Sequence, residues 1–76
     1  ELLMLAEGLN IFRVAVPASY VGKSLHETRI RIETGCNVIA ICDRETTCTN
    51  PDPSYRFKEK DELILIGPTE AESLFI

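Results

Sequence analysis

Residues 37–42, NVIAIC, most tightly constrain what this chain can fold into, because apolar side chains occupy nearly every position on both faces of the segment. A strand of this kind is buried on both faces, which requires a layer of structure on each side. The chain has 76 residues, and a domain of about that size buries only about 60% of the surface that its unfolded form exposes. We therefore predict that another copy or domain buries one face of residues 37–42, and that the chain self-associates.

Two further segments predict strands in the same sheet. Residues 11–16 alternate, with Phe12, Val14 and Val16 on one side, and Pro17 ends the segment. Residues 62–67, ELILIG, form a second apolar strand. Strands with at least one apolar face indicate a sheet that is covered by helices.

A helix is predicted from Ser24 to Gly35. Ser24 and Glu27 have the spacing of a capping box, in which each side chain bonds the backbone amide of the other residue. Gly35 suits the left-handed residue that ends a helix, so a strand can start at once. A second capping box, Thr69 to Glu72, predicts a C-terminal helix.

The remaining segments set the boundaries of the domain. Residues 1–8 are interpreted as a linker or helix end from a longer protein, closed by Gly8, and residues 9–76 as one regulatory domain. Residues 46–48 are expected to form a short hairpin arm, and the prolines of NPDP (50–53) exclude a regular helix or strand there. The predicted fold is α+β, with a small mixed or mainly antiparallel sheet and helices on one face.

Composition excludes several function classes. The formal net charge is −4 and no cluster of Lys and Arg occurs, so we expect no nucleic-acid partner. No apolar run reaches the ~20 residues that span a bilayer. The three cysteines, at 36, 42 and 48, indicate a reducing compartment and lack the close pairs of a zinc site, so no metal is expected. His26 has no partner spaced for a catalytic set, and we expect no enzyme.

Arg31 and Asn37 are the candidate binding residues. The Gly35 turn folds one back over the other, and a guanidinium with an amide beside an apolar strand suits a phosphate and a base edge. A structural alternative is equally physical: Arg31 pairs with Glu27 one helical turn away, and Asn37 caps the turn.

Several motifs in fixed order carry a family resemblance. They are FRVAVP, SYVGKSLHE, GCNVIAI, NPDP and FKEKDELILIGP, and the match covers nearly the whole chain, from Leu9 to Phe75. On these motifs the sequence resembles the TrkA-C domain, the C-terminal lobe of RCK regulators of potassium channels and transporters. The resemblance implies a cytoplasmic, dimerising regulatory domain at the inner face of the membrane, attached to a cation channel, transporter or antiporter, with potassium the expected ion.

The resemblance also implies a ligand. In some family members two copies bind cyclic di-AMP between them, through an Arg on the helix and an Asn that opens the next strand. These positions match Arg31 and Asn37, with Val38 and Ile39 as apolar neighbours, so cyclic di-AMP is the expected ligand and no other cofactor is expected. Residues 46–48 supply Thr, Thr and Cys where such a site has a further polar or His contact. The alternative function is a ligand-free dimerisation module of a transporter.

Overall fold

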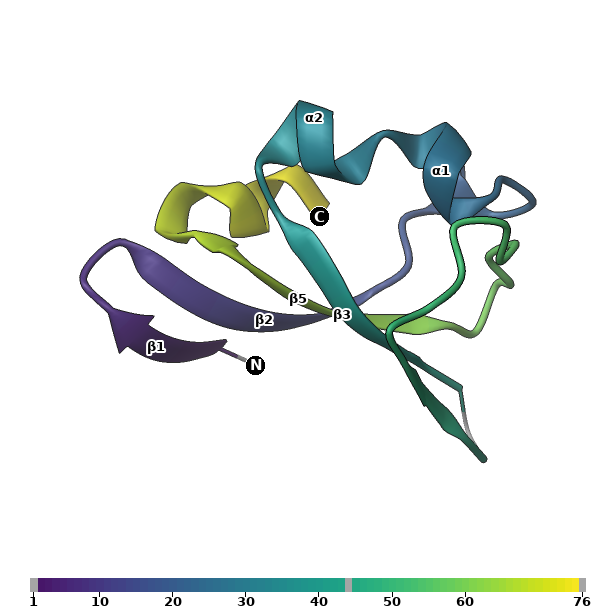
Figure 1. The fold of residues 1–76 in the computed structure, drawn as a ribbon, viewed down its shortest axis with the longest axis horizontal. Coiled ribbons are helices and arrows are strands. Elements are labelled where there is room, and N and C mark those ends of the chain that lie inside the picture. Colours follow the sequence, from purple (N-terminus) through teal and green to yellow (C-terminus); the bar gives the residue numbers. More distant parts are fainter. Residues whose placement is uncertain (1, 44, 76) are drawn as a thin grey trace.

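A five-stranded sheet organises the chain (Figure 1). The computed structural model describes residues 2–43 and 45–75, with side chains from residue 4 onward. The strand order is β1-β2-β5-β3-β4, and every neighbouring pair is antiparallel. The strands are β1 (Leu2–Ala6), β2 (Leu9–Ala15), β3 (Asn37–Cys42), β4 (Thr47–Thr49) and β5 (Glu62–Pro68).

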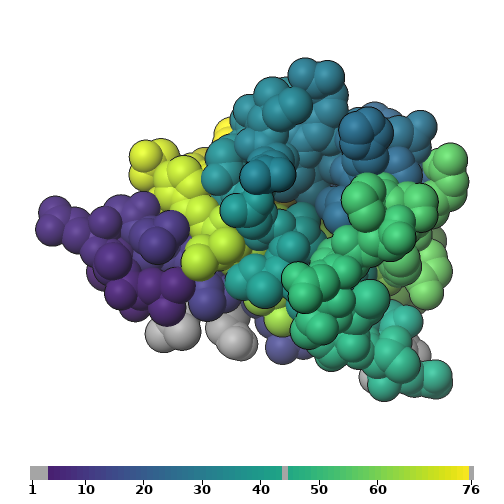
Figure 2. Space-filling view, in the orientation of Figure 1, coloured from purple at the N-terminus to yellow at the C-terminus, as the bar shows by residue number. Residues whose placement is uncertain are grey.

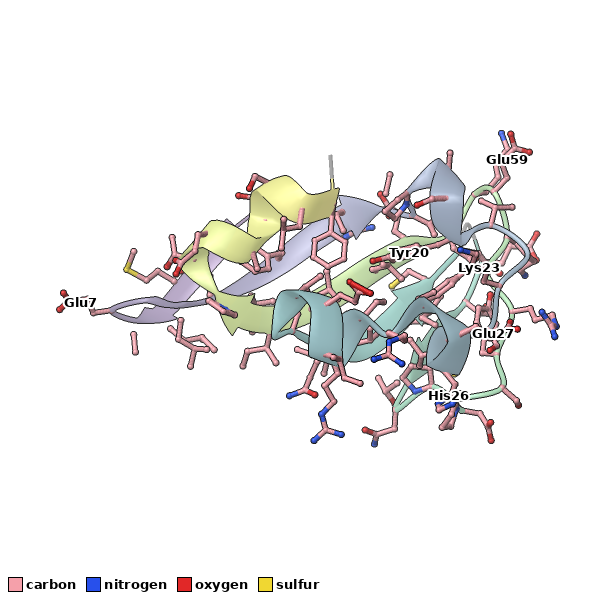
Figure 3. All side chains as sticks on the ribbon, turned by 90° about the horizontal axis from the view of Figure 1, so that it is seen from above. Glu7, Tyr20, Lys23, His26, Glu27 and Glu59 are labelled. Carbon is pink, nitrogen blue, oxygen red and sulfur yellow. The ribbon has the colours of Figure 1, made fainter. Side chains whose placement is uncertain are left out.

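Helical segments cover one face of this sheet, as Figure 1 shows from the side and Figure 3 from above. They are the 3-10 turn η1 (Ala18–Tyr20), α1 (Leu25–Thr28), α2 (Ile30–Thr34) and the 3-10 helix η2 (Thr69–Phe75). The predicted α+β fold, with helices on one face, is confirmed. Among the described residues, no helix is long and apolar enough to cross a membrane.

The core lies between the sheet and these helices. Phe12 of β2 faces Leu65 of β5 across the antiparallel ladder, and both are fully buried. Ile30 of α2 and Phe75 of η2 belong to the same buried cluster. The residue pairs that alternate with these along the ladder, such as Ile11 with Ile66, point to the face of the sheet that no helix covers.

The helical region differs from the prediction in two places. The expected helix from Ser24 to Gly35 is broken at Arg29, which adopts a left-handed backbone with φ 54° and separates α1 from α2. The second capping box is wrong, because the Thr69 hydroxyl accepts a hydrogen bond from the buried Asn10 amide at 2.8 Å. The expected C-terminal helix is present as the 3-10 helix η2.

Residues 2–6 form an edge strand, so the expectation of a helix end for residues 1–8 is wrong. Leu2–Ala6 pairs with β2, and Gly8 at φ 79° closes the hairpin between them. A left-handed Gly suits a hairpin turn as well as a helix cap, so the local signal does not separate the two.

The apolar strand 37–42 is buried differently from the prediction. Ala40, Ile41 and Cys42 are each less than 9% exposed within the single chain, and β4 and β5 pair with β3 on its two edges. A register shift between Val38 and Ala40 also interrupts the alternation of faces. The prediction that another chain must bury this strand is therefore wrong for residues 40–42, whereas Asn37 is exposed and Val38 and Ile39 are half-buried, so self-association through the start of the strand stays a prediction.

The expected hairpin arm is present as β4. Thr47–Thr49 pairs with β3, and the Asp43 carboxylate closes the turn by accepting bonds from the amides of Glu45 and Thr46, both at 2.9 Å. These bonds hold the pKa of Asp43 at about 2, well below its ordinary value.

Candidate ligand-binding site

A surface pocket of about 590 Å³ lies where α1, α2 and the start of β3 meet the segment after β4. This volume falls within the range of small-molecule sites. Figure 2 shows this side of the molecule, hollowed between the teal of α2 and β3 and the green of the segment that follows β4. The lining residues are Leu25, His26, Arg29, Ile30, Arg31, Ile32, Cys36, Asn37, Val38 and Pro53.

The turn between α2 and β3 brings Arg31 and Asn37 to this pocket. Gly35, at φ 76°, donates its amide to the Arg31 carbonyl at 3.1 Å and ends the helix. The Thr34 hydroxyl accepts the Cys36 amide at 3.2 Å, which fixes the start of the strand. Three of the four expected residues therefore line one pocket: Arg31, Asn37 and Val38. Ile39 is half-buried at the irregularity of β3 and does not line it.

The opposite wall is held by backbone bonds between distant segments. The His26 amide donates to the Pro53 carbonyl at 2.9 Å, and the Leu25 amide donates to the Tyr55 carbonyl at 2.8 Å. The Phe57 amide continues this ladder to the Lys23 carbonyl at 3.0 Å. These bonds place Pro53 against the pocket.

The first-turn amides of α1 are all used by the protein itself. Besides the Leu25 and His26 bonds, the Ser24 amide donates to the Glu27 carboxylate at 2.8 Å and the Glu27 amide to the Ser24 hydroxyl at 3.1 Å. The predicted capping box is thus confirmed. The Gly22-Lys23-Ser24 sequence consequently has no free amides with which to bind a phosphate.

The pocket is cationic in an acidic chain. Arg29 and Arg31 supply its positive charge, and no Asp or Glu is among its lining residues, whereas the chain as a whole carries a net charge of −4. His26 projects from α1 to the outside of the molecule (Figure 3). An anion entering this pocket therefore meets positive charge with no carboxylate in the lining.

Arg31 does not form the expected alternative pair. The Glu27 carboxylate is bonded to the Ser24 amide and to Arg56 at 3.2 Å, and these contacts lower the pKa of Glu27. Among the described residues, the Arg31 guanidinium and the Asn37 amide meet no hydrogen-bond partner. Both side chains remain available to a ligand, and the alternative of an Arg31–Glu27 pair with a capping Asn37 is wrong.

Sequence reasoning did not find His26, Arg29 and Pro53 as lining residues. A histidine on a short helix and a proline 27 positions away carry no local signal of shared position. Within the described part of the chain, no group of three or more metal-ligating side chains occurs. Cys36 and Cys42 are buried, Cys48 is exposed, and all three are free thiols.

The family assignment follows from comparison with known proteins. The TrkA-C domain model matches residues 9–76. This chain belongs to the TrkA-C domain family. That family is a regulatory one and not a family of enzymes. No curated protein sequence matched the chain.

Solved structures of RCK domains resemble the chain over most of its length. The GsuK channel bound to NAD is 38% identical, with a TM-score of 0.79; the match covers 91% of this chain and 13% of that one. The RCK C domain of the potassium transport protein KtrA, in complex with cyclic di-AMP, is 28% identical with a TM-score of 0.83, and the match covers 93% and 84% of the two chains.

A third structure supports the fold alone. The RCK_C domain dimer of S. agalactiae BusR, in complex with cyclic di-AMP, is 20% identical with a TM-score of 0.75, and the match covers 83% and 86% of the chains. The TrkA-C chain described here is therefore homologous to RCK C domains of potassium channels and potassium-transport regulators. It spans only a small part of the GsuK channel.

Proposed function

We propose that this domain senses cyclic di-AMP for a potassium channel, transporter or antiporter on the cytoplasmic side of a membrane, and that two copies bind one ligand between them. The observation that carries the proposal is the cationic pocket with its unpartnered Arg31 and Asn37. The similarity of the chain to the KtrA domain, which was solved in complex with cyclic di-AMP, supports the choice of ligand.

Each lining group has a role in this proposal. The Arg31 guanidinium binds a phosphodiester oxygen, since its planar fork suits phosphate geometry. The Asn37 amide binds an adenine edge, because it offers both a donor and an acceptor. Val38, Ile30 and Pro53 supply apolar surface for the purine ring.

Two copies are expected to complete the site. Ile32 lies on the rim of the pocket and is 73% exposed, which is unusual for an isoleucine beside a binding site. A second copy that packed on Ile32 would bury it and close the pocket over the ligand. The ligand then regulates the transport protein by favouring one arrangement of the two copies over another, through its differential affinity.

Calorimetric titration of the chain with cyclic di-AMP tests this function. We expect one ligand bound per two chains, and no detectable heat from Arg31→Ala. Arg56→Ala is the matched control, because its guanidinium pairs with Glu27 outside this pocket. Tight binding that survives Arg31→Ala, or an absence of binding to the unaltered chain, rejects the proposal.

Ile32 also supports a second candidate function, a dimerisation module with no ligand. An exposed isoleucine on a short helix suits a contact with another copy whether or not a ligand is present. Sedimentation of Ile32→Asp and of the unaltered chain, each with and without cyclic di-AMP, separates the two. A dimer that forms equally without ligand, together with no heat on titration, favours the structural module.

A further inference from the structure

Among the residues that the structure describes, two other than glycine have a positive φ: Arg29 at 54° and Asn50 at 48°. Asparagine tolerates this left-handed conformation, because its short polar side chain bonds locally. Arginine has no such compensation, and its Cβ crowds the following carbonyl oxygen. Arg29 therefore occupies a position where Gly or Asn fits the backbone better.

The fold does not use the Arg29 side chain. The Arg29 amide donates to His26 at 3.2 Å, and its carbonyl accepts from Ile32 at 3.1 Å and Glu33 at 2.8 Å. All three bonds are made by the backbone, so any residue would form them. The side chain is exposed, and among the described residues its guanidinium meets no hydrogen-bond or ion-pair partner.

The left-handed break decides where this side chain lies. On one continuous helix, residues two positions apart point to opposite sides, since each residue turns by about 100°. Arg29 and Arg31 nevertheless line the same pocket, because Arg29 separates α1 from α2 and resets the direction of the chain. The break thus places two arginines in the lining of one pocket.

We infer that Arg29 is a second phosphate-binding residue of this pocket, and that arginine occupies the left-handed position for its side chain. The inference rests on the proposed function. A phosphodiester has two non-bridging oxygens, and Arg29 and Arg31 of one copy each donate to the same phosphate. A strained left-handed residue beside a binding site, whose side chain the fold does not use, is typical of a functional position.

Four substitutions test the inference by titration with cyclic di-AMP and by thermal unfolding without ligand. Arg29→Gly and Arg29→Asn should each weaken binding by about tenfold or more, as loss of a charge-assisted bond predicts. Their unfolding temperatures should be unchanged or higher, because both residues accept the left-handed backbone. Arg29→Lys should restore part of the affinity, and Asn50→Gly, the matched backbone control, should leave affinity within about twofold.

Salt dependence provides a readout that a purely structural role would not change. Between low and high ionic strength, the affinity of Arg29→Asn should fall less than that of the unaltered chain, because one cation–phosphate contact is missing. Equal salt dependence contradicts the inference.

The outcomes distinguish this inference from the proposed function. Binding that Arg31→Ala abolishes but Arg29→Gly and Arg29→Asn leave within about twofold overturns the role of Arg29 alone. If Arg29→Asn lowers the unfolding temperature and Arg29→Lys recovers no affinity, Arg29 has a structural role. That result also overturns the inference that Arg29 binds phosphate. If the unaltered chain binds no cyclic di-AMP, both the proposed function and the inference fail.

Discussion

The arginines Arg13 and Arg56 differ from Arg29 and Arg31 in what their guanidinium groups meet. Arg13 of β2 bonds Glu62 of β5 at 2.7 Å. Arg56 bonds Glu27 at 3.2 Å and also the Gly22 carbonyl at 2.8 Å. The other two line the pocket and meet no partner among the described residues.

This difference separates arginines that join elements of the fold from arginines that face a cavity. The chain has 12 acidic and 8 basic residues, so carboxylates for pairing are not scarce. Two like charges in one pocket also repel each other, which disfavours the ligand-free state. The arrangement becomes favourable when an anion occupies the pocket, and the predictions below test that explanation.

The largest expected effect is that of Arg31→Glu on ligand affinity. Placing a carboxylate against a phosphate costs several kcal/mol, so affinity for cyclic di-AMP should fall by more than about 100-fold. The unfolding temperature of the ligand-free protein should barely change, because the side chain is exposed. Calorimetry measures the affinity and a thermal melt measures the unfolding temperature. A large drop in the unfolding temperature would show that Arg31 stabilises the fold, as Arg13 and Arg56 are expected to do.

Asn37→Ala should have a smaller effect on binding. Losing the hydrogen bonds to an adenine edge should weaken the affinity by about tenfold, at roughly 1 kcal/mol per bond. The preference for cyclic di-AMP over cyclic di-GMP should shrink as well, since Asn37 reads the base. Competition titrations measure this preference, and an unchanged ratio would remove Asn37 from base recognition.

Ser24→Ala tests an arginine that pairs within the fold, Arg56. Ser24 holds the capping box that also positions Glu27 for Arg56. Loss of an N-cap costs about 1 kcal/mol, which corresponds to ~4–8 °C in the unfolding temperature of a domain this size. Thermal unfolding followed by circular dichroism measures it. A melt equal to that of the unaltered chain would show that the cap contributes little.

Acid should weaken the fold through bonded carboxylates. Amide hydrogen bonds from Glu45 and Thr46 lower the pKa of Asp43 to about 2, and the Ser24 amide lowers the pKa of Glu27. Because these pKa values lie below those of the unfolded chain, their contribution is present above about pH 4 and is lost as the pH falls through the folded values. The unfolding temperature should therefore fall between about pH 4 and pH 2, with a shallower fall in Asp43→Asn. Parallel curves for the two proteins would contradict this assignment.

The smallest expected effect is that of the Arg13–Glu62 pair. Both side chains are nearly half exposed, and exposed pairs contribute about 0–1 kcal/mol. Arg13→Gln, Glu62→Gln and the double variant should give a coupling free energy within that range by urea unfolding. A coupling well above about 1 kcal/mol would show that the paired arginines stabilise the fold more than their exposure indicates.

Local signals predicted the parts of the site that lie close together in sequence. The capping box of Ser24 and Glu27 and the left-handed Gly35 each involve groups within three or four residues, and both occur as predicted. Because only Gly35 and Cys36 separate α2 from β3, the juxtaposition of Arg31, Asn37 and Val38 also followed from the sequence.

The rest of the pocket depended on contacts between distant segments. Pro53 reaches His26 through a backbone bond across 27 positions, and no periodicity encodes such a pairing. The break at Arg29 had no sequence signal either, because arginine is a good helix former. Ile39 was expected in the site, but the irregularity of β3 moves it out of the pocket lining.

The sequence by itself therefore determined the helix cap, the Gly35 turn and the apolar strands, since these follow from backbone bonding and side-chain periodicity within a few residues. Tertiary structure alone decided that Leu2–Ala6 is an edge strand of the sheet, that residues 40–42 of β3 are buried within one chain, and that Arg29 and Arg31 share a pocket. Each of these depends on which distant surfaces meet, and the free energy of those contacts outweighs weak local preferences.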